Sequence, residues 1–498
     1  MNMERYDWRY YTEPEPHLDN RRLHTPRGKV LGGSSSINGL VYVRGNPLDF
    51  ERWAQEGARG WSYRDVLPYF KRAERRAGGG DDYRGEAGKL ATRRGELENP
   101  LYGAWLAAGR EAGYPLTDDM NGYQQEGFGR MDMTVGDGRR CSAAAAYLHP
   151  AMRRRNLAVR THALATRVLF EGRRAIGVRY ERGGVAEEVR ARRAVIVCAG
   201  PINSPQLLKL SGVGAARELG EHGIAVVQDL AGVGENLQDH LELYIQVAAR
   251  VPVTLYSHVS AWQRALVGLR WLVKHDGLGA SNHFETGGFI RSRVGVRYPD
   301  IQFHFLPLAV SYDGTSLARE HGFQAHVGPM RSASTGWVRL RSADAHDKPR
   351  ILFNYMSREE DWQEMRACVR LTREIFAQPA FAPYRGREIQ PGETVTSDAA
   401  IDAFVRAKAE SAFHPSCTCR MGSASDPRAV VDPEARVLGL EGLRVVDSSI
   451  MPSITTGNLN APTIMLAEKA ADLIRGRPAA SAGEVPYYVA GNWQSAQR

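Results

Sequence analysis

The sequence predicts an α/β protein, α+β when taken as a whole, in which a doubly wound domain is interleaved with a domain built on an antiparallel sheet. Three observations support this fold class. At 498 residues the chain exceeds the size at which a single core stops growing. The unbroken apolar segment Ala194–Cys198 runs directly into a helical pattern, as in a parallel sheet. Between residues 251 and 412 longer alternating strands favour a second, antiparallel sheet.

The expected elements of the first half begin with an extended stretch before residue 50, which has few helical periods. Ser62 predicts the N-cap of a helix that ends before Gly78–Gly80. Two more helices are expected over Leu101–Ala112 and Ser142–Tyr147. Short alternating runs separated by glycines and charges then predict an antiparallel meander; these runs are Leu157–Thr161, Leu164–Phe170, Ala175–Tyr180 and Glu187–Ala191.

The second half predicts a strand buried on both faces at Ala194–Cys198, with a helix that starts at Ser204–Pro205. The later elements are the strands Ile301–Phe305 and Gly336–Arg341, the amphipathic helix Arg358–Ala377, the buried strand Leu443–Asp447 and the helix Ala461–Ile474. We therefore expect a first domain over residues 1–250 and 426–476, a second over 251–425, and a poorly ordered tail over 477–498.

The composition is that of an ordinary globular protein, with 43% apolar and 24% charged residues. Its net charge of +9 comes from scattered arginines without an aromatic-interleaved stripe, which argues against nucleic acid and is compatible with peripheral contact to an anionic membrane. No apolar run approaches the roughly eighteen residues of a membrane span, and Met1–Arg9 is polar. This indicates a cytoplasmic protein, either free or peripheral on the inner membrane.

The cysteines argue against disulfides and against a metal site. There are five, an odd and sparse number for this length, so free thiols are expected. Cys417 and Cys419 form a Cys-x-Cys pair beside His414, but no second ligand pair lies nearby in the sequence. We therefore predict packed cysteines and no metal.

The segment Gly28–Gly39 brings bare backbone and small hydroxyls together. Gly32 and Gly33 let the main chain approach a ligand closely, while Ser34 and Ser35 add donors that phosphate oxygens accept. Taken alone, the segment is more typical of a flexible surface loop. The choice between these two interpretations depends on the rest of the chain.

The wider sequence resembles the glucose-methanol-choline (GMC) family of flavin oxidoreductases. Gly28–Glu51 resembles the first family signature position by position, and Gly200–Gly214 resembles the second. Three further stretches resemble the choline-oxidising members of the family, namely Gly232–His240, Phe413–Gly422 and Gly442–Asn460. The resemblance covers nearly the whole chain and implies an FAD-binding domain with an interleaved substrate domain.

This resemblance implies the catalytic residues. His414 matches the histidine that accepts the alcohol proton while the carbinol hydride leaves for flavin N5, and a reference pKa of about 6.5 suits histidine to that task. Asn458 matches the partner position, where a neutral amide holds the substrate oxygen without competing for its proton. Asn458 and Asn460 also fit a simpler interpretation, in which they cap a turn before the last helix.

The resemblance also implies non-covalently bound FAD, because some members attach the flavin through a histidine where this chain has Ile37. The expected cofactor-binding residues come from the first signature, the meander and the last buried strand with the helix after it. They are Gly32, Gly33, Ser34, Ser35, Asn38, Gly39, Val41, Val168, Asp447 and Asn460.

The implied substrate is a small alcohol, choline, whose oxidation gives betaine aldehyde and, after a second oxidation, glycine betaine. Aromatic faces and a carboxylate bind a trimethylammonium group, and Ser281–Phe289 resembles the corresponding segment of choline-oxidising members. Glu285 is therefore the expected counter-charge, although an ordinary exposed glutamate fits the pattern as well. Another primary alcohol stays open as the substrate, and the electron acceptor is either membrane-bound or soluble.

The sequence departs from the family pattern at its start. Family members begin with a strand, a G-x-G-x-x-G loop and a helix, and none of these precedes the first signature here. Gly212–Gly214 and Gly232–Gly234 lack the third glycine and do not replace the loop. We therefore expect the first domain to be incomplete at its N-terminus, which leaves open a truncated, flavin-free protein that is not an enzyme.

Overall fold

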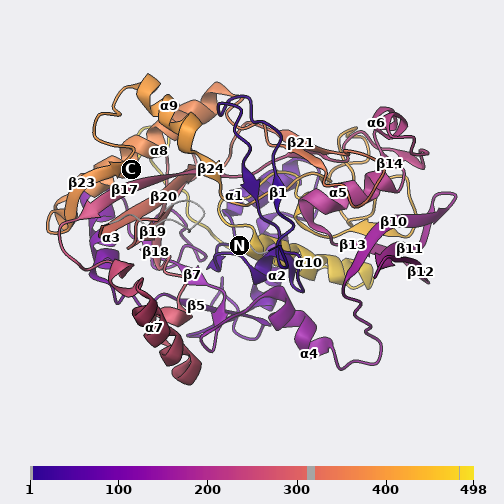
Figure 1. Ribbon diagram of the computed structural model, residues 1–498, viewed down its shortest axis with the longest axis horizontal. Coiled ribbons are helices and arrows are strands. Elements are labelled where there is room, and N and C mark those ends of the chain that lie inside the picture. The colour runs from indigo at the N-terminus through magenta and orange to yellow at the C-terminus, as the bar shows by residue number, and fades with distance from the viewer. Residues whose placement is uncertain (1–3, 311–319, 482) are drawn as a thin grey trace.

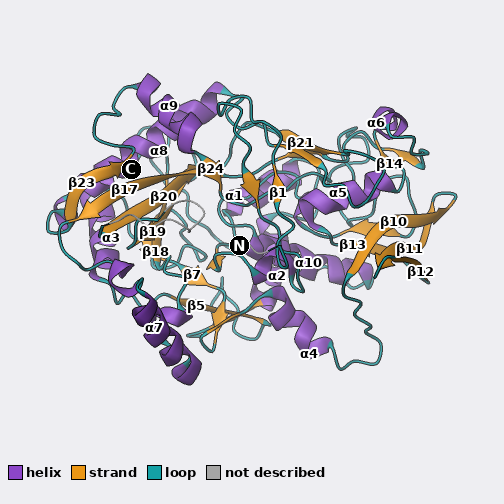
Figure 2. Cartoon of the chain, in the orientation of Figure 1, coloured by secondary structure: helices purple, strands orange, loops and turns teal. Residues whose placement is uncertain are grey.

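The computed structural model describes residues 4–310, 320–481 and 483–498. Figure 1 shows two parts side by side, with the largest sheet on the left and smaller sheets around α5 and α10 on the right. Figure 2 shows that loops make up much of the chain between them. The helices are α1 (Pro47–Gln55), α2 (Tyr63–Ala73), α3 (Pro100–Glu111), α4 (His149–Ala151), α5 (Gly200–Leu210), α6 (Ala216–Glu221), α7 (Ala261–Lys274), α8 (Glu359–Ala377), α9 (Asp398–Lys408) and α10 (Asn460–Ile474).

Shorter helical turns complete these elements. They are the 3₁₀ turns η1 (Gly33–Ser36), η3 (Leu255–His258), η4 (Gly277–Ala280), η5 (Pro379–Phe381) and η6 (Ser448–Ile450), and the π turn η2 (Ala144–Leu148). The segment that predicted an alanine-rich helix over Ser142–Tyr147 therefore folds as a π turn that leads into α4.

The largest sheet has seven strands, all paired antiparallel. Its order is β23 (Arg385–Gln390), β17 (Leu241–Ala249), β20 (Gly322–Pro329), β19 (Ile301–Leu306), β18 (Thr286–Ile290) and β6 (Gly127–Arg130), with β24 (Glu410–Ser411) also paired to β17. The antiparallel second sheet is confirmed. Because β6 and β17 precede residue 251, the sheet also draws on chain outside the expected limits 251–425.

The smaller sheets contribute short strands. The meander is a three-stranded sheet of β10 (Ala163–Glu171), β11 (Arg174–Arg182) and β12 (Val185–Arg190). A four-stranded sheet has the order β3 (Val41–Tyr42), β7 (Asp132–Met133), β5 (Leu90–Arg94) and β4 (Glu74–Arg76), and another three-stranded sheet has the order β16 (Glu235–Leu237), β21 (Gly336–Arg339) and β22 (Arg350–Leu352). The two-stranded sheets are β1 (Tyr10–Tyr11) with β2 (His24–Thr25), β8 (Val135–Gly136) with β9 (Arg139–Arg140), β13 (Val195–Val197) with β25 (Leu443–Val445), and β14 (Val213–Gly214) with β15 (Gln228–Asp229).

The seven-stranded sheet has one apolar and one polar face, because side chains alternate along each strand. The apolar face carries Ile301, Phe303 and Phe305 of β19 with the matching residues of β17 and β20, and it packs against α3 and α8. The opposite face of β19 carries Gln302 and His304, which are nevertheless buried. This polar, buried face is the place to look for function.

The two predicted buried strands pair with each other in parallel as β13 and β25, which confirms a parallel arrangement but not full burial. Val195 and Val197 are buried, whereas Ile196 is 42% exposed. Ile196 points to the opposite face from its neighbours, and within the described residues β13 pairs only with β25. The prediction of a strand covered on both faces is therefore wrong at Ile196.

Helix α5 begins at Gly200 rather than at the predicted Ser204–Pro205. Pro201 occupies the first turn, where a missing N–H costs nothing. Pro205 then lies inside the helix and leaves the carbonyl of Pro201 without its usual donor. The Thr418 hydroxyl donates to that carbonyl at 2.7 Å, which explains how the helix continues past Pro205.

Two further predictions are wrong. The run Leu157–Thr161 forms no strand; the meander begins at Ala163 and has three strands. The tail after residue 476 is fixed to the body rather than loose, because Gly295 donates to the carbonyl of Trp493 at 2.8 Å and the Arg291 guanidinium donates to the carbonyl of Ala496 at 2.9 Å. Arg291 is buried, so the tail supplies an acceptor that this charge needs.

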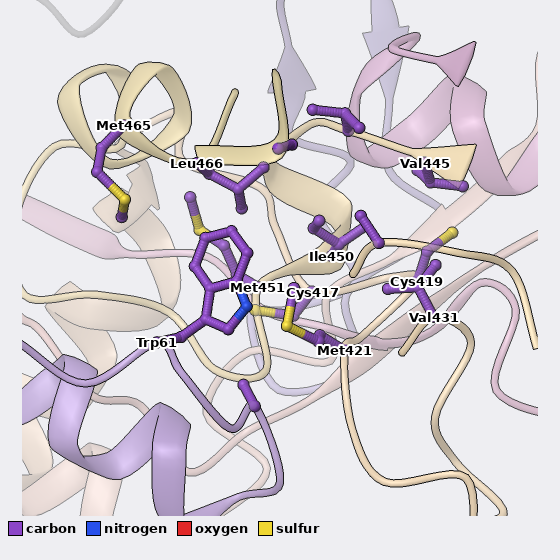
Figure 3. Close-up of a cluster of buried hydrophobic side chains, with 14 of the residues drawn as sticks. Trp61, Cys417, Cys419, Met421, Val431, Val445, Ile450, Met451, Met465 and Leu466 are labelled. Atoms are coloured by element: carbon purple, nitrogen blue, oxygen red, sulfur yellow. The ribbon is translucent and has the colours of Figure 1, made fainter. Parts of the chain in front are cut away.

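Cys417 and Cys419 lie in a hydrophobic core, as predicted for packed cysteines. Figure 3 shows them with Trp61, Met421 and Met451, and both side chains are fully buried. Burial raises the pKa of the Cys417 thiol to about 12, so it stays protonated near neutral pH. Among the described helices, none combines the length and apolar character needed to cross a bilayer.

Candidate active site

His414 lies just after β24, on a backbone held by a buried carboxylate. Its N–H donates to Asp239 Oδ1 at 2.6 Å, and the hydroxyls of Ser411 and Tyr355 donate to Asp239 Oδ2. Burial raises the pKa of Asp239 to about 6, and the hydrogen bonds from Ser411 and Tyr355 act in the opposite direction. Asp239 therefore fixes the main chain from which the His414 ring projects.

The rings of His240 and His414 form one hydrogen-bonded series with Asn458. His240 Nε2 lies 3.1 Å from the Met330 carbonyl, and His240 Nδ1 lies 3.0 Å from His414 Nδ1. His414 Nε2 lies 3.1 Å from Asn458 Nδ2. The two residues predicted to be catalytic, His414 and Asn458, are thus in direct contact.

The Met330 carbonyl at one end of this series determines which nitrogen of each histidine carries a proton. A carbonyl only accepts, so His240 Nε2 must carry a proton and, in a neutral ring, its Nδ1 carries a lone pair. His414 Nδ1–H then donates to His240, which leaves the lone pair of neutral His414 on Nε2. Asn458 donates its N–H toward that nitrogen. The protein therefore aims the basic nitrogen of His414 at the Asn458 amide.

Burial keeps these imidazoles neutral. It lowers the pKa of His414 well below its ordinary value of 6.5, and the nearby His240, His304 and Arg27 lower it further. Burial likewise lowers the pKa of His240 and of His304 to about 4 each. His414 is therefore neutral at physiological pH and keeps one ring nitrogen unprotonated.

A row of side chains continues from Asn458 across the polar face of the sheet. His304 Nε2 donates to Asn458 Oδ1 at 3.2 Å, and the β-ladders pair His304 with His326 and His326 with Tyr244. The Tyr244 and His326 rings lie 3.8 Å apart, and the Phe284 ring lies 5.1 Å from His326. The row thus combines an oxygen-binding end with an aromatic end.

The aromatic end also holds a carboxylate, Glu242, two residues before Tyr244 on the same face of β17. Glu242 Oε1 lies 3.5 Å from His326 Nδ1. Burial raises the pKa of Tyr244 well above its usual 10.0, and the negative charge of Glu242 adds to that shift. The arrangement of rings around a carboxylate suits an organic cation.

The structure does not bring Glu285, the expected counter-charge, to this row. Its carboxylate accepts from the Leu97 N–H at 2.7 Å and from the Ser281 hydroxyl at 2.6 Å. Phe284, one residue earlier, is the neighbour of His304 and His326. Adjacent side chains of an extended segment point to opposite sides, so Glu285 faces away.

The glycine segment near the N-terminus forms a compact turn. Gly32 is left-handed, with φ 87°, and η1 follows it. Ser34 accepts from the Gly28 N–H at 3.1 Å, and the Ser35 hydroxyl donates to Gly32 O at 2.6 Å and accepts from the Ala143 N–H at 2.9 Å. The Ser35 hydroxyl is therefore used within the chain itself.

Other expected cofactor residues lie on several elements. Arg140 donates to Asn38 Oδ1 at 2.8 Å, and the Val168 N–H donates to Ser211 Oγ at 2.8 Å. Asp447 Oδ2 accepts from the Gly200 N–H at 2.9 Å and from the Ser204 hydroxyl, which joins the end of β25 to the start of α5. Val41 lies in β3, and Asn460 begins α10.

The glycine backbone leaves room for a flat ligand at two of the expected cofactor positions. A Cβ on Gly33 would meet no atom within 4 Å, and a Cβ on Gly39 would meet only the Phe284 ring, at 4.0 Å. Open space therefore borders bare backbone at both glycines, and at Gly39 it adjoins Phe284 of the aromatic row. The residues present are consistent with a planar, anionic cofactor.

Two family models match this chain. The N-terminal model of the GMC oxidoreductases matches residues 15–242 and the C-terminal model matches residues 332–467. The chain belongs to the GMC oxidoreductase family. Since the N-terminal match already begins at residue 15, it gives no support to the expectation that the first strand-loop-helix unit is lacking.

Curated GMC relatives match along nearly the whole chain. The oxygen-dependent choline dehydrogenase of Brucella suis biovar 1 (strain 1330) is 58% identical over 100% of this chain and 90% of its own length. The mitochondrial choline dehydrogenase of Homo sapiens is 57% identical over 97% of this chain and 82% of its own length.

Solved structures of GMC-like fold agree with the computed one. Pyridoxine 4-oxidase from "Mesorbium loti" aligns with a TM-score of 0.85 at 30% identity, over 95% of this chain and 89% of the other. An FAD-dependent oxidoreductase from Chaetomium thermophilum aligns with a TM-score of 0.86 at 26% identity, over 95% and 90%. The mixed α/β fold class is confirmed.

Several residues of this candidate site escaped the sequence analysis. Gln302 and His304 stand at the polar positions of a strand that was correctly predicted as alternating, so a search for polar side chains on that face would have found them. Glu242 and Tyr244 carry the same signal in β17. His240 closes a stretch already singled out by resemblance, Gly232–His240, without a role assigned to it.

Proposed function

We propose that this GMC oxidoreductase is an FAD-dependent choline dehydrogenase that oxidises choline to betaine aldehyde and, in a second turnover, to glycine betaine. The observation that carries the proposal is the buried row in which a base and an amide at one end face aromatic rings and a carboxylate at the other. The names of the 58% and 57% identical relatives support the same substrate.

His414 is the proposed general base and Asn458 the oxygen anchor. The His414 Nε2 lone pair and the Asn458 amide N–H point at each other across 3.1 Å. An alcohol oxygen that lies beside both groups would displace this direct hydrogen bond, accept from the Asn458 N–H and donate its proton to His414 Nε2. Removing that proton concentrates negative charge on the substrate oxygen and makes its neighbouring C–H bond a better hydride donor.

Bound FAD would accept the hydride, because none of the amino-acid side chains can act as a hydride acceptor. The residues proposed to hold it, without a covalent bond, line the glycine turn, the meander and the end of β25. They are Gly32, Gly33, Ser34, Asn38, Gly39, Val41, Val168, Asp447 and Asn460, with Ser35 shaping the turn.

Glu242 replaces Glu285 as the proposed counter-charge for the trimethylammonium group. The carboxylate of Glu242 lies beside His326, whereas both oxygens of Glu285 already accept hydrogen bonds from Leu97 and Ser281. The cation would lie against the rings of Tyr244, His326 and Phe284. A cation–π contact of this kind contributes about 0.5 to 2 kcal/mol.

Electrons from the reduced flavin are proposed to leave for dioxygen in solution or for an acceptor in the membrane. The name of the Brucella relative includes oxygen dependence, and the net charge of +9 favours peripheral contact with an anionic bilayer. Reoxidation of the reduced protein by dissolved dioxygen, measured with and without membrane vesicles, separates the two acceptors.

The test is anaerobic stopped-flow bleaching of the flavin by choline and by its neutral isostere 3,3-dimethylbutan-1-ol. We expect choline to have the higher specificity constant, since the site offers a carboxylate and rings to a cation. His414→Ala should slow bleaching by about a hundredfold or more. Equal constants for the two alcohols would favour a different primary alcohol, and a purified chain that binds no flavin would favour a non-enzyme.

A further inference from the structure

Helix α7 (Ala261–Lys274) carries a continuous apolar stripe on the outside of the protein. No residue of this helix is buried. Trp262 is 71% exposed, Leu266 42%, Leu269 58% and Val273 71%. These four positions follow the spacing i, i+4, i+7 and i+11, which places them on one side of a helix.

The opposite side of α7 attaches it to the body. Trp271 Nε1 donates to the Gly138 carbonyl at 2.7 Å, and the Trp271 ring lies against Gly279 of η4. Trp271 stands roughly half a turn away from Trp262 and Val273 on the helix wheel, at about 3.6 residues per turn. The helix is therefore held in a fixed orientation, with its second apolar side directed outward.

Positive charge accompanies the stripe. Arg270 and Lys274 lie along one edge of the stripe on the helix wheel, whereas Arg264 lies near Trp271 on the attached side. Lys274 is exposed, and Arg270 is paired with Asp276 at 2.6 Å. An apolar stripe bordered by basic side chains is the pattern of helices that lie in the interface of a bilayer without crossing it. Isolated apolar residues on a surface are ordinary, but a contiguous stripe of this length is not.

A second exposed segment lies at the same edge of the molecule. After α4, Arg153, Arg154 and Arg155 stand in sequence between the exposed apolar side chains of Met152 and Leu157. In the part of the chain that the structure describes, none of these three guanidinium groups forms an ion pair. They are free to meet phosphate groups.

Figure 1 shows α7 and the chain after α4 projecting together from the lower edge of the molecule, some distance apart. A flat surface laid along that edge would therefore meet both. A small partner protein would fit one of them, whereas an extended anionic plane matches the apolar stripe and the arginines at once.

We propose that α7 and residues 152–157 form a docking surface for the headgroup region of an anionic phospholipid bilayer. The Trp262, Leu266, Leu269 and Val273 side chains enter the boundary of the acyl region, and Arg153, Arg154 and Arg155 contact lipid phosphates. This proposal rests on the membrane contact included under the proposed function and does not depend on the substrate.

The experiment is co-sedimentation of the full chain with vesicles of phosphatidylcholine and phosphatidylglycerol at a ratio of about 7 to 3, a mixture whose charge attracts basic side chains. We expect binding to these vesicles and about tenfold weaker binding to phosphatidylcholine alone. Trp262→Glu with Leu269→Glu should weaken binding about tenfold or more at every salt concentration, because it removes apolar contact.

Replacing the three arginines 153–155 by glutamine should weaken binding to a similar degree at low salt and have little effect at high salt, since screening removes their contribution. The matched control for the α7 variant is Val185→Glu with Val189→Glu, two exposed apolar side chains of β12, which lies across the molecule from α7 in Figure 1. This control should bind as the parent does.

Choline oxidation measured without vesicles should be unchanged in all these variants, so a failure of docking and a failure of the proposed activity give different results. Vesicle binding that survives both sets of substitutions would overturn the proposal. It would equally be overturned if the glutamate substitutions on α7 converted a dimer to a monomer in light scattering and left vesicle binding intact, because α7 would then face a second copy.

Discussion

At the scale of single residues, His240 determines which nitrogen of His414 is basic. Its Nε2–H is committed to the Met330 carbonyl, so its Nδ1 accepts from His414. The role is that of the carboxylate in a catalytic triad, carried out by a neutral ring. We therefore propose His240 as a positioning residue, which would act on the reaction through the proposed base His414.

His240→Phe should therefore lower the bleaching rate about tenfold or more, because His414 loses the acceptor that selects its tautomer. His240→Gln should restore much of the rate, since an amide oxygen accepts the same hydrogen bond. Nitrogen-15 NMR of His414 checks the cause directly: the parent should show a protonated Nδ1, and the Phe variant a mixture of tautomers. Identical spectra in parent and Phe variant would contradict this role.

Glu242→Gln should raise the KM for choline about tenfold and leave that for 3,3-dimethylbutan-1-ol nearly unchanged, since only the first ligand carries the charge that the carboxylate balances. Steady-state kinetics with both alcohols measure this. Glu285→Gln is the matched control, and we expect it to affect thermal stability rather than substrate choice, because Glu285 bonds to Leu97 and Ser281. A larger specificity change from Glu285 than from Glu242 would reverse the assignment.

Sequence reasoning reached only part of this site. His414 and Asn458 follow from the family resemblance, and the structure places their side chains in contact. Glu242 could not be predicted as a site residue, since its neighbour His326 is brought to it by strand pairing between β17 and β20. Strand register depends on contacts between distant segments, which no local pattern specifies.

At the scale of elements, α2 and the strands after it are joined by a buried ion cluster around Glu74. The Arg44 and Arg84 guanidinium groups donate to its carboxylate at 2.6 Å each, and the Thr92 hydroxyl donates at 2.7 Å. Burial alone would raise the pKa of Glu74, but the two arginines outweigh it and lower the pKa to about 2.

This lowered pKa predicts acid sensitivity. The stabilisation from Glu74 is fully present above the pKa of this side chain in the unfolded chain, near its ordinary value of 4.5, and is lost as pH falls from there toward 2. Glu74→Gln should cost about 3 to 5 kcal/mol of unfolding free energy at pH 7, because buried Arg44 loses its carboxylate partner and Arg84 keeps only Asp119 and Asp132. Urea unfolding at pH 7 and pH 3 measures this, and the two proteins should differ less at pH 3. An equal difference at both pH values would exclude the cluster as the cause.

Elements with strong local signals were predicted well. Ser62 caps α2 as expected, with Asp65 completing a capping box, and α8 and α10 match their predicted segments closely. The predicted start of α5 was wrong because a proline such as Pro205 is typical of the first turn of a helix. Here the distant Thr418 hydroxyl bonds the carbonyl that an internal proline leaves unpaired. The true start of the helix thus depends on a tertiary contact that the local sequence does not show.

At the scale of the whole molecule, the prediction of two interleaved parts describes the fold, but the tail shows where composition misleads. The tail is rich in small and polar residues, yet the buried charge of Arg291 recruits its backbone. The tail is therefore ordered where its local sequence predicts disorder, because the buried Arg291 guanidinium needs a hydrogen-bond acceptor and the tail backbone supplies one.

The alternating faces of the large sheet also bear on which mutations this gene tolerates. In β19, residues of the polar face such as His304 alternate with core residues such as Phe303 and Phe305. Deleting a single codon within the strand would exchange the two faces on one side of the deletion, so core packing and the candidate site would be lost together. Deleting two codons would preserve the alternation. We therefore expect insertions and deletions among natural variants of this strand to come in pairs of residues.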